Sequence, residues 1–261
     1  MTTTSVVRVE RPEPGIAVVT LDRPESLNSL GRASMEQLPL VLWELAEDDD
    51  VSVVILTGAG KGFCAGADLA YLAQCVQDPD TDMGEIMREA VQTALALAAL
   101  PQVTIAAVNG PAAGAGWGLA LGCDLRIAGP TAKFGATFVR MGLGPDYGVA
   151  QTLPRIIGRE RAMELLSTGR IIDASEALRL GAVLAIEDDP LAAALELARS
   201  IAAAPGRALR SLKRTLDLSS DRGIATVIGE VEFDAQVELF DHPDFLAGAA
   251  TWLTKHGAVV R

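Results

Sequence analysis

The 261-residue sequence predicts an α/β fold that ends in an all-helical tail. Short, continuous apolar runs such as Val51–Leu56 and Val103–Val108 are typical of strands buried on both faces of a sheet. A glycine-rich turn and a helical segment follow each run, and this alternation of strand and helix indicates an α/β body. Strand signals stop near Pro205, so we expect a body over residues 1–204 and a helical region over residues 205–261.

The individual elements follow from local patterns in chain order. β-branched apolar runs favour strands, whereas apolar residues recurring every three or four positions favour helices. The expected strands are Val6–Val9, Ile16–Leu21, Val51–Leu56, Val103–Val108 and Leu125–Ala128, with a turn at Pro12–Gly15. The expected helices are Met35–Ala46, a helix from Ala67, Glu85–Leu100, Ala115–Gly122, Ala208–Leu218, Ile224–Phe240 and Pro243–Lys255.

Composition limits the partners. The formal net charge of −12 disfavours nucleic acid, because an acidic chain repels phosphates. Hydrophobic residues make up 49% of the chain, which is enough for a sizeable core. The three cysteines form no CxxC motif, so we expect no disulfide framework and a reducing, cytoplasmic location. The longest apolar run, Ala94–Leu100, is too short to cross a bilayer, and no secretory leader is visible, so no membrane partner is expected.

Two glycine-rich turns carry the first functional signal. Gly62–Leu69 (GFCAGADL) follows one apolar run, and Asn109–Gly116 (NGPAAGAG) follows the next. Small residues let a ligand approach the main chain, and a helix start leaves free N–H groups at a positive dipole end. Two such turns together predict a site for a developing oxyanion. The alternative is that the glycines only allow helix and strand to pack closely, and neither turn matches a nucleotide-binding motif.

The sequence resembles the crotonase superfamily, which includes the enoyl-CoA hydratases and isomerases. Five segments in order carry the resemblance: Leu21–Leu30, Gly62–Leu69, Val108–Ala128, Pro154–Leu166 and Thr168–Gly181. The resemblance implies a spiral of ββα repeats, a C-terminal helical region used in trimerisation, and a homotrimer or homohexamer. It also implies an acyl-CoA thioester as substrate, with coenzyme A as part of that substrate, no further cofactor and no metal.

Site residues follow from the same resemblance, position by position. The two oxyanion amides fall on Ala67 and Ala115. Asp68 is expected to orient its turn by accepting backbone N–H bonds, while Arg23 and Lys255 are expected to meet coenzyme A. The remaining expected binding residues are Ala65, Gly66 and Gly114 beside the amides, and Trp117 and Phe138 as walls of an apolar acyl pocket.

The carboxylates decide the reaction. The two glutamates of the family's hydratases fall on Gly118 and Phe138, neither of which can transfer a proton. Asp146, in a Pro/Gly turn, resembles the catalytic aspartate of the family's isomerases and aromatic-acyl-CoA dehalogenases. An apolar pocket raises the pKa of such a carboxyl toward neutrality, which suits a base. The alternative is that Asp146 is an Asx-turn or helix N-cap residue.

We therefore predict an isomerase or lyase of the superfamily, most simply a double-bond isomerase with Asp146 as acid and base. Three rival hypotheses remain open: Asp146 as the nucleophile of a hydrolase or dehalogenase, a non-catalytic acyl-CoA-binding protein, and an enoyl-CoA hydratase by homology alone. The two histidines, His242 and His256, lie in the tail and predict neither a catalytic triad nor a metal site.

Overall fold

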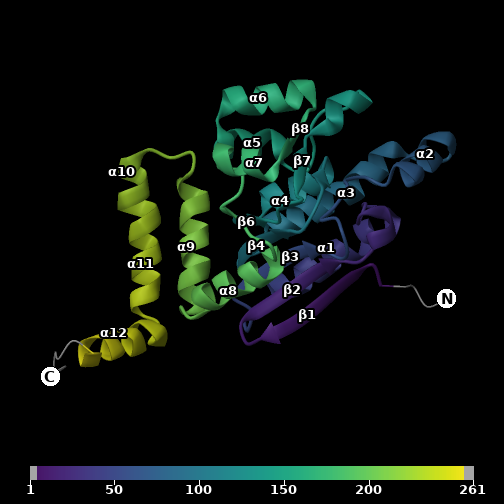
Figure 1. Cartoon of the computed structure of the whole chain (residues 1–261). Coiled ribbons are helices and arrows are strands. Elements are labelled where there is room, and N and C mark those ends of the chain that lie inside the picture. Colours follow the sequence, from purple (N-terminus) through teal and green to yellow (C-terminus); the bar gives the residue numbers. More distant parts are fainter. Residues whose placement is uncertain (1–4, 256–261) are drawn as a thin grey trace.

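A six-stranded sheet with the order β1-β2-β3-β4-β6-β9 forms the centre of the body (Figure 1). The structure is a computed structural model that describes residues 5–255, apart from the side chain of Lys255. The strands of this sheet are β1 (Val7–Glu13), β2 (Ile16–Leu21), β3 (Val53–Gly58), β4 (Val103–Val108), β6 (Leu125–Ala128) and β9 (Ala185–Ile186). Only the β1–β2 pair is antiparallel, and the remaining pairs of this sheet are parallel.

Alternate residues of the strands enter two separate cores, as expected for strands covered on both faces. On one face, β-strand residues such as Ile55 and Ile105 pack against Ala194 and Ala198 of helix α8 (Pro190–Ala202). The intervening residues, such as Leu56, point into a larger core built with the other helices of the body. This arrangement confirms the α/β class and explains the continuous apolar runs.

The other helices of the body lie on the opposite side of the sheet or above its edge. They are α1 (Arg32–Ala46), α2 (Leu69–Gln77), α3 (Met83–Ala98), α4 (Ala115–Gly122), α5 (Val149–Ile157), α6 (Arg159–Thr168) and α7 (Ala174–Leu180). Two short 3₁₀ helices, η1 (Pro24–Ser26) and η2 (Thr137–Met141), connect them. The ranges predicted for α4 and β4 agree with the structure at both ends.

Two strand predictions need correction. β1 continues to Glu13 through Pro12, so the turn is shorter than the predicted Pro12–Gly15. An edge strand tolerates proline because one side of its backbone pairs with no neighbour, and the β1–β2 register shifts at this point. β3 spans Val53–Gly58 and so lies two residues later than the predicted Val51–Leu56, with Val53 paired to Ile16 of β2.

A second, three-stranded sheet was not predicted. Its order is β5-β7-β8, with β5 (Ala112–Ala113), β7 (Lys133–Gly135) and β8 (Ile171–Asp173). Strands of two or three residues give no alternation that a sequence pattern can detect. This small sheet matters because β5 belongs to the second glycine-rich turn.

The tail consists of helices that extend away from the body (Figure 1). They are α9 (Gly206–Ser219), α10 (Ile224–Thr226), a π-helical segment η3 (Val227–Glu232), α11 (Phe233–Phe240) and α12 (Pro243–Lys255). Lys213 of α9 fastens the tail to the body, because its Nζ donates to Asp124 at 2.8 Å and to the carbonyl of Gln102 at 3.0 Å. Among the helices of residues 5–255, none is long and apolar enough to cross a membrane.

Candidate active site

Two asparagine side chains hold the turn that follows β3. Asn28 donates from Nδ2 to the carbonyl of Gly62 at 2.8 Å. Asn109, just after β4, donates from Nδ2 to the carbonyl of Gly58 at 2.8 Å and to that of Gly62 at 3.2 Å. The two side chains fix the path of the chain into the segment Phe63–Asp68. Sequence reasoning missed both roles, because an asparagine that serves distant carbonyl groups has no characteristic spacing.

The backbone N–H of Ala67 is left free by this path. The N–H of Leu30 donates to the carbonyl of Gly66 at 2.7 Å, and the carbonyl of Leu30 accepts from Asp68 at 3.0 Å. The Gly66 carbonyl and the Ala67 N–H belong to one trans peptide group and point in opposite directions, so the Ala67 N–H faces away from Leu30. It has no hydrogen-bond acceptor within the described residues.

A second free N–H lies at the start of α4. The helix begins at Ala115, and its first N–H groups have no partner inside the helix. The preceding Gly114 has φ 52° and ψ −124°, a conformation that residues with a Cβ rarely adopt. Its own N–H donates to Gly135 of β7 at 2.8 Å, so the small second sheet holds the turn in place.

The two turns lie directly against each other. The N–H of Ala113 donates to the carbonyl of Cys64 at 3.0 Å, and the N–H of Cys64 donates to the carbonyl of Pro111 at 3.1 Å. A side-chain carbon on Gly66 would lie 2.6 Å from the oxygen of Ala113 and 3.5 Å from the nitrogen of Ala115. The structure therefore brings the segment of Ala67 beside the N–H of Ala115, and glycine at position 66 is what permits the contact.

Asp68 orients the first turn, as the sequence predicts. Its Oδ1 accepts from the N–H groups of Ala70 (3.1 Å) and Tyr71 (3.2 Å) and so caps α2. Its Oδ2 accepts from Arg23 at 2.9 Å. Burial would raise the pKa of Asp68, but the Tyr71 N–H and the Arg23 guanidinium outweigh it and hold that pKa below its usual value. Asp68 is thus a fully engaged, ionised carboxylate.

Arg23 lies beside the first glycine-rich turn, where it contacts more than Asp68. Besides Asp68, its guanidinium donates to the carbonyl of Ser29 at 2.9 Å. The side chain stays 25% exposed, so part of the guanidinium is accessible. Contact with coenzyme A stays a prediction for Arg23. The same holds for Lys255, which ends α12 but whose side chain lies outside the described part of the structure.

Asp146 has the opposite character to Asp68. Its backbone carbonyl accepts from Val149 at 3.0 Å, but the N-cap of α5 is Gly148, and no side chain caps that helix. The N-cap alternative is therefore wrong. Oδ1 of Asp146 is buried and has no hydrogen-bond partner in the structure. Burial raises the pKa of Asp146 to about 6. A carboxyl in this state can accept and return a proton near neutral pH.

Tyr147 connects the Asp146 turn to the amide turns. A side-chain carbon on Gly118 of α4 would come closer than 3.0 Å to Cβ of Tyr147. Gly118 lies one helical turn after Ala115 in α4. Tyr147 contacts this first turn of α4, and Asp146 is the residue before Tyr147 in the chain. Burial raises the pKa of Tyr147 above its usual value, and the neighbouring Asp146 carboxylate acts in the same direction. No sequence pattern predicted this contact of Tyr147.

Phe138 and Trp117 differ in position. Phe138 is buried, and its ring lies 3.7 Å from the point where a Cβ on Gly114 would be, so it packs beside the second turn. Trp117 is only 1% exposed and its ring is 6.0 Å from that of Phe134 in the core. Trp117 is therefore packed in the core in this structure, and its role as a pocket wall stays a prediction.

Ala65 lies between the two functional positions of its turn. Its N–H donates to the carbonyl of Leu27 at 2.9 Å and so helps to fix the turn, while contact of Ala65 with the substrate stays a prediction. Among residues 5–255 there is no group of three or more histidine, cysteine, aspartate or glutamate side chains arranged to hold a metal ion.

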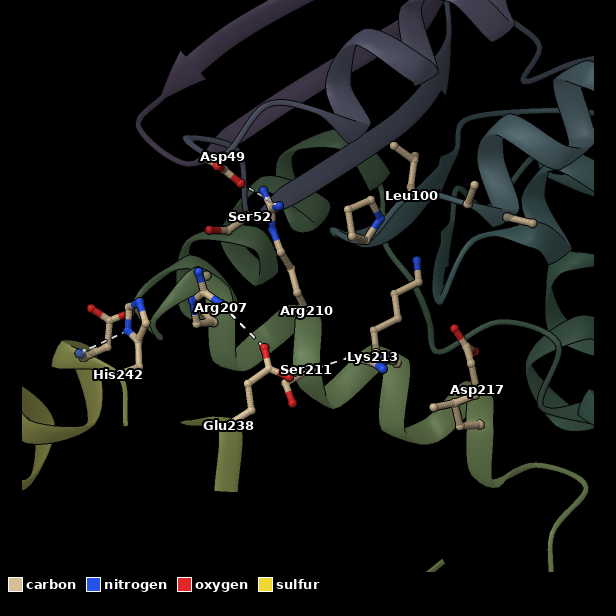
Figure 2. Close-up of a pocket in the computed structure, with 17 residues that line it drawn as sticks. Asp49, Ser52, Leu100, Arg207, Arg210, Ser211, Lys213, Asp217, Glu238 and His242 are labelled. Atoms are coloured by element: carbon tan, nitrogen blue, oxygen red, sulfur yellow. Dashed lines mark hydrogen bonds and ion pairs between the residues drawn. The ribbon is translucent and has the colours of Figure 1, made fainter. Parts of the chain in front are cut away.

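A separate cleft of about 730 Å³ lies between α9 and the amino ends of β3 and β4 (Figure 2). Its charged groups are largely paired with one another: Arg210 lies 2.8 Å from Asp49, and Arg207 lies 3.6 Å from Glu238. The amide turns follow the carboxyl ends of the same two strands, so the cleft is at the opposite edge of the sheet. Open ligand sites in parallel sheets lie at the carboxyl edge, which favours the amide turns as the site.

Comparison with known proteins agrees with this geometry. The family model "Enoyl-CoA hydratase/isomerase" matches residues 11–259. The chain therefore belongs to the enoyl-CoA hydratase/isomerase family, within the crotonase superfamily, and acts on acyl-CoA thioesters.

Individual relatives carry two kinds of name. The 1,2-epoxyphenylacetyl-CoA isomerase of Escherichia coli K12 is 38% identical over 246 residues, covering 93% of this chain and 94% of that protein. "Probable enoyl-CoA hydratase EchA14" of Mycobacterium tuberculosis is 37% identical over 240 residues, covering 90% and 93%. The crystal structure of an enoyl-CoA hydratase from Bacillus anthracis matches with a TM-score of 0.88 and 33% identity, covering 98% of each chain.

Proposed function

We propose that this protein is an acyl-CoA isomerase that moves a double bond by a proton shift. The N–H groups of Ala67 and Ala115 bind the thioester carbonyl oxygen. The carboxylate of Asp146 removes a proton from the carbon α or γ to that carbonyl, which leaves a dienolate whose negative charge rests on the amide-bound oxygen. The same carboxyl then returns the proton at the other end. The double bond shifts by one position, and no water is consumed.

The observation that carries the proposal is the state of Asp146. A buried carboxylate oxygen without a partner is costly, so folded proteins retain few of them outside functional sites. A pKa of about 6 keeps the group mostly ionised at neutral pH while it can still hold a proton during turnover. The turn of Asp146 meets α4, the helix whose first N–H is free.

Hydration is less well supported, although several relatives bear that name. Adding water needs a second group that holds the water while the first delivers a proton. The resemblance places the hydratase carboxylates at Gly118 and Phe138, and the structure puts a core-packed ring at Phe138. The relative named 1,2-epoxyphenylacetyl-CoA isomerase, at 38% identity, is about as similar to this chain as the probable hydratase EchA14, at 37%.

The test is an assay of purified protein with 2-enoyl-, 3-enoyl- and dienoyl-CoA esters, together with the variants Ala115→Pro and Ala115→Ser. Proline is tolerated at the first position of a helix but has no N–H. We expect Ala115→Pro to lower kcat by about 100- to 1000-fold, as loss of one oxyanion donor does elsewhere, and Ala115→Ser to stay near wild type. Equal turnover by Ala115→Pro and wild type would show that this amide binds no oxyanion. Binding without turnover of any ester would support the acyl-CoA-binding alternative.

We also infer that the working unit is an oligomer built through the tail, as a homotrimer or a dimer of trimers. Apolar side chains on α9, η3 and α11 are more than half exposed in the single chain, among them Leu212, Leu216, Ile228 and Phe233. Exposed apolar surface on this scale is typical of a protein interface. Sedimentation equilibrium would measure the mass, and a monomer at assay concentration would contradict the inference.

A further inference from the structure

Gly118 and Tyr147 approach each other closely, and the proposed mechanism does not use this approach. A Cβ at position 118 would be closer than 3.0 Å to Cβ of Tyr147, 3.2 Å from Cγ2 of Val149 and 3.3 Å from the carbonyl oxygen of Tyr147. The nearest of these atoms is attached directly to the backbone and cannot rotate away. Position 118 therefore accepts no side chain while Tyr147 is in place.

The geometry of α4 shows what a side chain at position 118 would otherwise reach. Each Cα–Cβ bond of an α-helix tilts toward the helix amino end. Residues three apart share a face, so a side chain at 118 would lean back toward Ala115 and its free N–H. Under the proposed function, the thioester carbonyl binds at this N–H, so the adjacent space is where a second acid, base or held water would have to lie.

Cβ and the carbonyl oxygen of Tyr147 block the start of this path, and they do so from a strained backbone. Its φ is +50°, one of three non-glycine residues with positive φ in residues 5–255. Such a conformation is costly for a residue with a Cβ, so the surrounding structure must impose it. The side chain is partly buried against the core, close to Cys64 of the first turn and adjacent to Asp146.

We propose that Tyr147 determines reaction specificity by occupying the volume beside Gly118, so that Asp146 is the one acid–base group of the pocket. This inference rests on the proposed isomerase function. The dipeptide Asp146–Tyr147 then acts as a unit: its first residue supplies the carboxylate that shifts the proton. Its second residue excludes the group that would add water to the double bond.

A first test asks whether Tyr147 excludes a side chain at position 118. It measures thermal stability, which does not depend on enzyme activity. Four proteins are melted: wild type, Gly118→Ala, Tyr147→Gly and the double variant. Replacing glycine by alanine inside an open helix raises stability, so a fall is diagnostic. We expect Gly118→Ala to lower Tm by several degrees when Tyr147 is present. In the Tyr147→Gly background the blocking Cβ is gone, so Gly118→Ala should lower Tm by less than half as much as it does in wild type. Equal shifts in both backgrounds would overturn the proposed exclusion.

Two matched variants complete the stability test. Gly248 lies inside α12 with no atom within 4 Å of its Cβ position, so Gly248→Ala should not lower Tm. Tyr147→Phe keeps the Cβ and the ring, so Gly118→Ala should lower Tm in that background as it does in wild type. If Gly118→Ala lowered Tm less in the Tyr147→Phe background than in wild type, the fall would depend on the hydroxyl group, and the steric explanation would be overturned.

Specificity is tested with Gly118→Glu and Gly118→Glu/Tyr147→Gly on a 2-enoyl-CoA, following loss of the conjugated thioester and appearance of 3-hydroxyacyl-CoA. We expect the double variant to hydrate at least about tenfold faster than Gly118→Glu alone. If wild type isomerises and the stability cycle shows coupling, but the double variant gains no hydration, the specificity role of Tyr147 is wrong. If wild type has no isomerase activity, the proposed function fails while the stability cycle still reports the exclusion.

Discussion

Two aspartates lie in turns at the candidate site, Asp68 before α2 and Asp146 before α5, and their surroundings are opposite. Asp68 accepts hydrogen bonds from two backbone N–H groups and from Arg23, and its pKa is held below the usual value. Asp146 has a buried oxygen with no partner, and burial raises its pKa to about 6. The same side chain is therefore a fixed structural anion in one turn and a proton acceptor in the other.

The difference shows what makes a carboxylate useful for catalysis. Donors that stabilise the charged form remove any tendency to take up a proton, whereas burial without donors restores it. Asp68 lies next to the amide of Ala67 in sequence and could be mistaken for the base on proximity alone. Its hydrogen bonds assign it to holding the turn, and they leave Asp146 as the group suited to proton transfer.

The largest effect expected from this comparison is on catalysis. Asp146→Asn should lower kcat by about 100- to 10,000-fold, the usual contribution of a general acid–base group. Asp68→Asn keeps an acceptor at the cap and should lower kcat far less. Steady-state kinetics of both variants on the best ester of the panel measures the contrast. If the two substitutions cost the same, or if Asp68→Asn costs more, Asp146 is not the base.

A smaller effect is expected in the pH profile. The base must be ionised, so kcat/KM should rise with pH up to about 6 and then level off, falling about tenfold per pH unit below that point. Because the pKa of Asp68 is lowered, its titration should not appear in the same range. A profile measured from pH 4.5 to 8 that stays flat through pH 6 would contradict the raised pKa of Asp146.

The smallest effects are on stability, and they should have opposite signs. Asp68, with a lowered pKa, stabilises the fold above its unfolded pKa of about 3.9, and this contribution is lost as the pH falls. Asp146, with a raised pKa, destabilises the fold as the pH rises from about 4 to about 6, because the folded protein resists ionising it. At pH 7, Asp68→Asn should therefore lower the free energy of unfolding by about 1–2 kcal/mol. Asp146→Asn should raise it by about 1 kcal/mol, after allowance for partial solvent exposure.

Chemical denaturation at pH 7 and at pH 5 measures both changes. The difference between wild type and Asp146→Asn should shrink at the lower pH, where Asp146 takes up a proton in the folded state. The difference between wild type and Asp68→Asn should stay nearly the same, because pH 5 is still above the unfolded pKa of about 3.9 and the folded pKa of Asp68 is lower still. Destabilisation by Asp146→Asn at pH 7 would mean that the carboxylate has a stabilising partner, and the contrast with Asp68 would disappear.

Much of the fold was predictable because long elements carry their own periodicity. β2, β4 and α4 agree with the sequence at both ends, since each is bounded by glycine, proline or asparagine close to its limits. The second sheet was not predicted, because β5, β7 and β8 are too short for a pattern. At the site, the capping role of Asp68 was predicted from sequence and confirmed. The near-complete burial of Trp117 beside Phe134 was not predicted, because it depends on packing between separate elements.

By itself, the sequence determined which groups are available: two glycine-rich turns after buried strands, one aspartate in a Pro/Gly turn, and glycine at position 118. These follow from residue identity and from spacing along the chain. Only the tertiary structure decided how those groups behave. Atoms from distant segments determine whether a carboxylate has hydrogen-bond partners and whether Tyr147 blocks position 118. The reason is that hydrogen bonding, burial and steric exclusion act through space and not along the sequence.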